Sequence, residues 1–267
     1  MKRLQIGALR LFPLVFLLCS CDALKSVRSW GATLVNDPVP LPPVGIVVAC
    51  DHSSGSVCGP AELSSNVDAT LQMAAARPGS TVALWTFGSD VASTRELVRV
   101  ESPAASTRGD RARAAQQRSW IESSRAELLR ASRSIFSTDP LRSSPIAAGI
   151  SALALSRHEH DAIYVISTDG LECTRETFDF ECKQLPNTKV FLARMKALAL
   201  LTQGSLTGTR VIFANARIGA VGNDRCPISI SRVSAVRSLW SAAITNAGGT
   251  VRFTTDSVTA ADLGGNP

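Results

Sequence analysis

Short apolar runs and longer stretches of helical periodicity alternate along the chain from residue 44 onward. Nearly continuous apolar runs, such as residues 44–49 and 162–167, are typical of strands covered on both faces of a parallel sheet. Further strands are expected at residues 81–87, 95–100, 210–214 and 250–253. Helices are expected at residues 61–76, 110–136, 145–156, 190–201 and 233–246.

The order of these elements predicts the fold class. Strand–helix alternation is typical of an α/β fold in which a doubly wound, mostly parallel central sheet carries helices on both faces. In such sheets, ligands bind beyond the carboxyl ends of the strands. The segments after residues 44–49 and 162–167 are therefore the first places to search for a site, and they contain Asp51 and Asp169.

The first 43 residues have a different character from the domain at 44–267. Residues 1–20 combine a basic start with a short apolar run, which predicts an export signal. They end in Leu18-Cys19-Ser20-Cys21, which resembles the lipobox of bacterial lipoproteins. The resemblance implies cleavage after Ser20 and a lipid on Cys21, and a plain secretory signal or an uncleaved anchor is the alternative. Residues 21–43 form a polar, Pro-rich tether.

This organisation predicts a lipid-anchored protein of the cell envelope. Asp22 follows the lipidated cysteine and favours the periplasmic face of the inner membrane, and the outer membrane is the alternative. Without the three basic residues of the signal, the net charge falls from +6 to about +3, which does not indicate a nucleic-acid partner. The oligomeric state is left open by the sequence.

Hydroxyl and carboxyl side chains gather at both expected strand ends. The first strand is followed by Asp51-His52-Ser53-Ser54-Gly55-Ser56, and the fourth by Thr168-Asp169-Gly170. Between them, Ser144-Pro145-Ile146 opens a helix. This set resembles the metal-ion-dependent adhesion site of the von Willebrand factor type A family, and the resemblance spans about residues 44–256.

The resemblance implies a divalent cation held by Asp51, Ser53, Ser144 and Asp169. The family has a second serine where this chain has Gly55, and either Ser54 or Ser56 is the alternative source of that hydroxyl. Oxygen ligands of this kind suit Mg²⁺, or Mn²⁺ and Ca²⁺, better than Zn²⁺. In the family, an acidic residue of a partner completes the coordination. The expected function is thus that of a membrane-anchored module that binds a partner envelope protein.

Two other functions stay open at this stage. The first is an Mg²⁺-dependent hydrolase in which Asp51 and Asp169 hold the metal that activates water. The second is a structural envelope lipoprotein whose metal site is degraded at Gly55. The sequence contains no recognisable general base or oxyanion motif, so a non-enzymatic role is expected.

Five cysteines follow Cys21, and an odd number leaves at least one outside an intramolecular disulfide. They are Cys50, Cys58, Cys173, Cys182 and Cys226. Cys173 and Cys182 bracket a short loop after Asp169, which favours a disulfide between them in an exported protein. Cys58 is a rival partner for Cys173. Cys50 is expected to be a buried thiol at the end of its strand.

Overall fold

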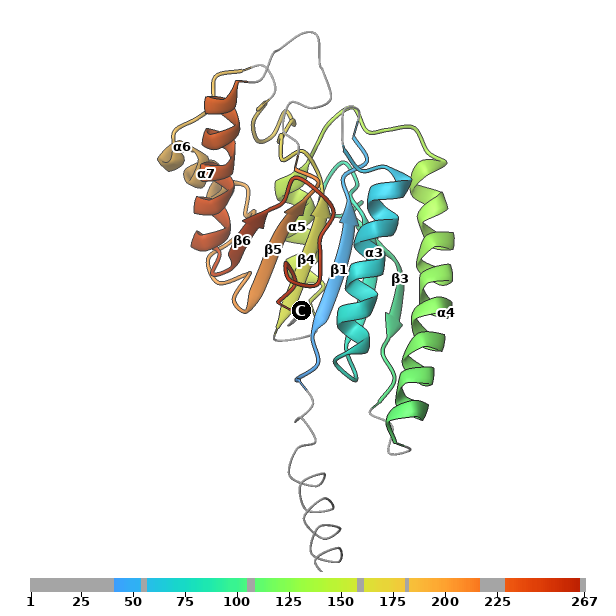
Figure 1. The fold of residues 1–267 in the computed structure, drawn as a ribbon. Helices are drawn as coiled ribbons and strands as arrows, with labels where there is room; N and C mark the ends of the chain where they lie inside the picture. Colours follow the sequence, from blue (N-terminus) through green and yellow to red (C-terminus); the bar gives the residue numbers. More distant parts are fainter. Residues whose placement is uncertain are drawn as a thin grey trace, which may run out of the picture. The chain divides into compact units, whose positions relative to one another are not determined.

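Six strands form one sheet in the computed structural model, which describes residues 41–53, 57–104, 109–157, 161–180, 183–216 and 229–264. The strand order is β3-β2-β1-β4-β5-β6 (Figure 1). The strands are β1 (Gly45–Cys50), β2 (Thr81–Thr86), β3 (Arg95–Glu101), β4 (Ala162–Ser167), β5 (Thr209–Ala214) and β6 (Thr250–Phe253). All neighbouring pairs run parallel except β2 and β3.

The register of the two central strands brings the candidate site together. Cys50, the last residue of β1, lies opposite Ser167, the last residue of β4. The segments that begin with Asp51 and Thr168 therefore leave the sheet side by side at one edge. Both strands are almost wholly buried because helices cover both faces of the sheet.

Helices cover the two faces in separate groups (Figure 1). On one face α3 (Pro60–Ala75) and α4 (Asp110–Phe136) bury side chains such as Leu63 and Leu128 against the strands. On the other face lie α5 (Ile146–Leu155), α6 (Thr188–Ala197) and α7 (Ile230–Asn246). This arrangement confirms the predicted doubly wound α/β fold.

Two helix boundaries differ from the prediction. The apolar run to residue 201 predicts a helix that continues to its end, but α6 stops at Ala197. Ala199 and Leu201 adopt left-handed backbone conformations, with φ of 54° and 47°. This turn buries Leu200 and Leu201 in the core, so burial of these two side chains outweighs continuation of the helix. The helix α7 starts three residues earlier than predicted because Ser229 caps it by accepting a hydrogen bond from the Arg232 amide.

The signal peptide, Cys21, Asp22 and most of the tether lie outside the described residues, so these stay predictions. Within the described ranges, no helix combines the length and apolar character that crossing a bilayer requires.

Candidate cation site at the carboxyl edge of the sheet

Asp51 is the centre of the candidate site. It follows β1 directly, and its backbone amide donates to the Ser167 carbonyl at 3.1 Å. Its side chain is fully buried, with 0% exposed. Carboxylate oxygen Oδ2 accepts hydrogen bonds from Ser144 Oγ at 2.6 Å and Thr168 Oγ1 at 2.8 Å. Oxygen Oδ1 is buried and has no hydrogen-bond partner among the described residues.

The surroundings of Asp51 oppose its ionisation. Burial raises the pKa of this carboxyl above its ordinary value, while the hydroxyls of Ser144, Thr168 and Ser53 lower it. Burial is the largest of these effects. Buried polar atoms in folded proteins are nearly all paired, because an unpaired one costs about 1–3 kcal/mol. Among the described residues, Oδ1 of Asp51 is an exception to this rule.

The loop that holds Ser144 is fixed to the segment after β4. The amide of each of Ser144 and Cys173 donates to the other's carbonyl, both at 3.0 Å. This small antiparallel bridge places the Ser144 hydroxyl against Asp51, although the two residues lie 93 positions apart in the chain. Ser144 is also the residue before Pro145, which caps α5.

Ser53 and His52 follow Asp51 but face different surroundings. Ser53 forms a parallel bridge with Leu141, and its amide and hydroxyl both lower the Asp51 pKa. His52 Nε2 lies 3.1 Å from the Thr138 carbonyl, and its ring packs edge-on against Phe136. The imidazole is thus engaged with the end of α4.

Asp169 lies at the same edge, one residue after Thr168. Its side chain is half-buried, and Oδ1 accepts a hydrogen bond from the Leu171 amide at 2.9 Å. Gly170 has a φ of 80°, in the left-handed region, and its amide donates to Thr168 Oγ1 at 3.1 Å. The turn therefore directs Thr168 toward Asp51. The other expected contributors, Ser54, Gly55 and Ser56, lie outside the described residues.

Two residues of this edge, Thr168 and Glu172, were not predicted as site residues from the sequence. Glu172 is fully buried; Oε2 accepts from the Ala147 amide at 2.9 Å, and Oε1 accepts from the Thr177 hydroxyl. Burial, with a smaller contribution from the Asp51 charge, raises its pKa to about 7. Thr168 belongs to the Thr-Asp-Gly pattern and could have been included from it. Glu172 has no local sequence signal, because its partner Ala147 lies 25 positions earlier.

The cysteine predictions require a correction. Cys50 forms a disulfide with Cys58, so it is not a buried thiol, and Cys58 is not a partner for Cys173. The disulfide closes a ring around residues 51–57, the loop that begins with Asp51. Cys182 and Cys226 lie outside the described residues, so the Cys173–Cys182 pair stays a prediction.

The donor set was tested against the implied cation. Among the described residues, no three His, Cys, Asp or Glu side chains gather as a metal-binding group, which excludes a zinc site of that kind there. The atoms that do gather are oxygens, from Asp51, Ser144 and Thr168, and Asp169 follows Thr168 in the chain. Hydroxyl and carboxylate oxygens with room for water suit Mg²⁺. The unpaired Oδ1 of Asp51 gives such a cation a negative ligand, so the residues fit it.

Comparison with known proteins gives only distant likenesses. No family model matches the chain, and no curated protein matches it. Two crystal structures of the pilus adhesin SpaC from Lactobacillus rhamnosus GG, one in an open conformation, align with TM-scores of 0.41. Sequence identities are 12% and 13%, over 81% and 86% of this chain. The matched part spans 29% and 30% of the adhesin chain. We therefore base the proposed function on the side chains of the site.

Proposed function

We propose that this protein is a lipid-anchored binding module of the cell envelope, of the von Willebrand factor type A kind. In this proposal, Asp51, Ser53, Ser144 and Asp169 hold a divalent cation, which offers a coordination position to an acidic side chain of a partner protein. The lipid on Cys21 keeps the module at the membrane. The observation that carries the proposal is the fully buried carboxylate of Asp51, one oxygen of which has no hydrogen-bond partner in the described part of the chain.

Each residue has a distinct task in this proposal. Asp51 supplies the buried negative charge, and its cost of burial is offset when a cation is present. Ser144 and Thr168 donate to Asp51 in the structure, and a hydroxyl oxygen has two lone pairs, of which one in Thr168 accepts from the Gly170 amide. Asp169 is half-buried at the rim and adds the second carboxylate. Glu172 holds the first turn of α5 in place through the Ala147 amide.

The hydrolase alternative has weaker support from the same contacts. A pKa of about 7 would suit Glu172 as a general base. However, Glu172 is fully buried, and both of its oxygens already accept hydrogen bonds. Because both oxygens already accept hydrogen bonds from the protein, this carboxylate has a structural role and is not free to act as a general base. We therefore favour binding over catalysis.

Calorimetric titration of the full chain in detergent with Mg²⁺ and Mn²⁺ tests the proposal. Asp51→Asn and Asp169→Asn preserve side-chain size and remove one charge each, so each is expected to weaken cation affinity by about a hundredfold or more. Asp110→Asn, at the exposed start of α4, is the matched control and should bind as the original chain does. Absence of cation uptake by the original chain, or equal affinity in all three variants, would exclude the proposed site.

Binding to a partner is tested separately. The full chain is immobilised and exposed to detergent-solubilised envelope proteins, with Mg²⁺ or with a chelator. A partner that engages through the cation must be captured with Mg²⁺, released by the chelator and not captured by Asp51→Asn. If the partner is captured equally well in the presence of the chelator and by Asp51→Asn, a structural lipoprotein is favoured instead.

A further inference from the structure

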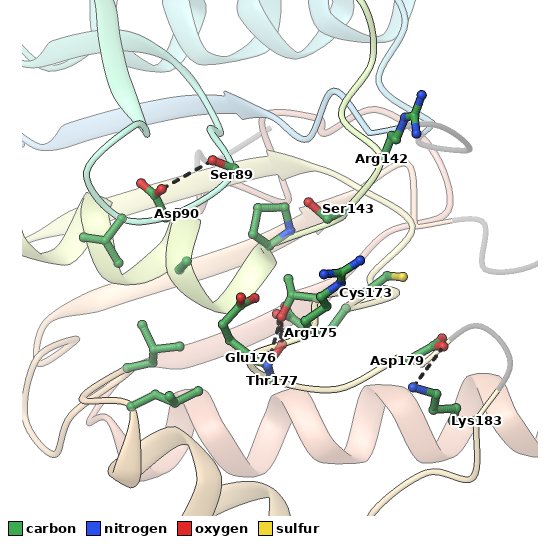
Figure 2. Close-up of a pocket in the computed structure, with 17 residues that line it drawn as sticks. Ser89, Asp90, Arg142, Ser143, Cys173, Arg175, Glu176, Thr177, Asp179 and Lys183 are labelled. Atoms are coloured by element: carbon green, nitrogen blue, oxygen red, sulfur yellow. Dashed lines mark hydrogen bonds and ion pairs between the residues drawn. The ribbon is translucent and has the colours of Figure 1, made fainter.

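A cavity of about 740 Å³ opens beside the candidate cation site. Its wall includes Ser143 and Pro145, which flank Ser144, and also Glu172 and Cys173 (Figure 2). The loop from Ser89 to Val91 lines it as well. The volume lies within the usual range for ligand pockets, about 300–1,000 Å³. The cavity is large enough to hold more of a partner than one side chain.

The acidic residues of this cavity are mostly engaged within the protein. Asp90 accepts hydrogen bonds from the Ser93 amide and hydroxyl, which hold its pKa below its ordinary value. Asp179 pairs with Lys183 at 4.0 Å. Glu172 is buried and bonded. Glu176 and Asp90 are the exposed carboxyls of the set.

The two arginines of the cavity are not engaged by other charged groups of the described residues. Arg142 and Arg175 are both exposed, and neither forms an ion pair within the described part of the chain. Figure 2 shows Arg175 close to Cys173 and Thr177, whereas Arg142 lies at the edge of the cavity and points away from Arg175. Both residues belong to the segments that the bridge between Ser144 and Cys173 holds together. Guanidinium groups pair well with carboxylates.

An apolar floor completes the cavity. It is formed by Val91, Ala148, Leu198 and Leu200. The first three are partly buried against the core below α5 and α6, and Leu200 is buried. The left-handed turn after α6 is what brings Leu198 and Leu200 to this place. A ligand that fills the cavity thus meets cationic groups near the cation site and an apolar surface beyond them.

We propose that this cavity receives a peptide segment of the partner in which acidic and apolar residues alternate. The inference rests on the proposed function: one acidic side chain goes to the cation, and the cavity binds the residues that follow it. A second carboxylate pairs with Arg175, Arg142 adds positive charge at the edge of the cavity, and an apolar side chain packs on Ala148, Leu198 and Leu200. The cavity, in this view, selects the partner, and the cation supplies a contact common to acidic sequences.

Fluorescence polarisation tests this with two labelled peptides, Asp-Gly-Leu-Glu-Leu and Asp-Gly-Leu-Gln-Leu, on the full chain in detergent with Mg²⁺. The Glu peptide is expected to bind about tenfold more tightly than the Gln peptide. The double variant Arg142→Gln/Arg175→Gln should abolish that difference and leave Mg²⁺ affinity unchanged. Arg118→Gln, an exposed arginine of α4 that does not line the cavity, is the matched control. Circular dichroism checks that the variants fold.

The outcomes separate this inference from the proposed function. If Mg²⁺ binds but the arginine variant keeps the preference for the Glu peptide, the cavity proposal is overturned and the cation site stands. If Mg²⁺ does not bind but the preference for the Glu peptide still depends on Arg142 and Arg175, the cation site is overturned and the cavity proposal stands. Failure of both peptides to bind overturns the cavity proposal. So does arginine-dependent binding of phosphatidylglycerol vesicles in place of the Glu peptide, because the ligand would then be a lipid surface.

Discussion

Two buried polar clusters lie at the same edge of the sheet and differ in one respect. In the first, Asn66 of α3 donates to Ser167 Oγ at 2.9 Å and to Asn215 Oδ1 at 3.1 Å, and accepts from the Val258 amide at 2.8 Å. Every polar atom of the Asn66 side chain is thus paired. In the second, Asp51 has two donors on one carboxylate oxygen and none on the other among the described residues.

This difference is the one that we expect between a structural cluster and the functional site that we propose. The Asn66 cluster joins α3, β4 and the segment after β6, and a neutral amide is sufficient for that purpose. The Asp51 cluster places a carboxyl group in an equally buried position, and one of its oxygens has no hydrogen-bond partner among the described residues. Local violations of the rule that buried polar groups are paired tend to occur at functional sites. A buried oxygen without a partner in the described ranges, as at Asp51, lowers the free energy of unfolding, whereas the fully paired amide of Asn66, fifteen positions later, does not.

The largest expected effect comes from breaking the paired cluster. Asn66→Ala leaves three buried groups without their partner, so the free energy of unfolding should fall by about 3–4 kcal/mol. Asp51→Asn retains an acceptor for Ser144 and Thr168 and removes the unpaired charge, so without cations it should leave the unfolding free energy equal or higher. Urea denaturation in chelator at constant pH measures both. A loss from Asp51→Asn as large as that from Asn66→Ala would contradict the distinction.

The second expected effect is a dependence of stability on pH, which arises from the buried carboxyl groups of Glu172 and Asp51. Glu172 has a pKa of about 7 in the folded protein, above its ordinary value of 4.5. The unfolded chain therefore loses this proton first as pH rises, and the folded state is penalised. Stability should fall between about pH 4.5 and 7 by roughly 3 kcal/mol, and the contribution should level off above that window. The raised pKa of Asp51 acts in the same direction.

Glu172→Gln removes this titration and keeps an acceptor for the Ala147 amide. Denaturation midpoints measured across the same pH window should therefore fall less steeply in the variant than in the original chain. Equal slopes in the two proteins would show that Glu172 does not carry the pH dependence.

The sequence predicted those features that depend on local patterns. Burial on both faces gives β1 and β4 their apolar runs, so the strands and the parallel sheet could be foreseen. The end of α6 could not, because burial of Leu200 and Leu201 in the core decides it. Asp51 and Asp169 could be selected because they follow buried strands, whereas Ser144 was selected through a family resemblance, since no local signal links it to Asp51, 93 positions away. Glu172 was missed for the same reason.

The Cys50–Cys58 disulfide is another feature that sequence spacing did not predict. Cys50, at the end of β1, is bonded to Cys58, two residues before α3 begins. Sequence spacing alone favoured the loop between Cys173 and Cys182, because the two residues bracket it.

The smallest expected change in stability comes from opening that disulfide, and it should affect the two clusters unequally. The variant Cys50→Ala/Cys58→Ala frees a ring of short sequence separation, which should lower the unfolding free energy by about 2–3 kcal/mol. The freed loop begins with Asp51, so Mg²⁺ affinity should also fall by about tenfold, because the first ligands are no longer held in place. Asn66 lies outside the ring, and its contacts with Ser167 and Val258 should persist. Calorimetry and urea denaturation measure the two effects. A reducing agent should reproduce both losses in the original chain and cause no further loss in the variant; a variant that binds Mg²⁺ as tightly as the original chain would show that the disulfide supports the fold and not the site.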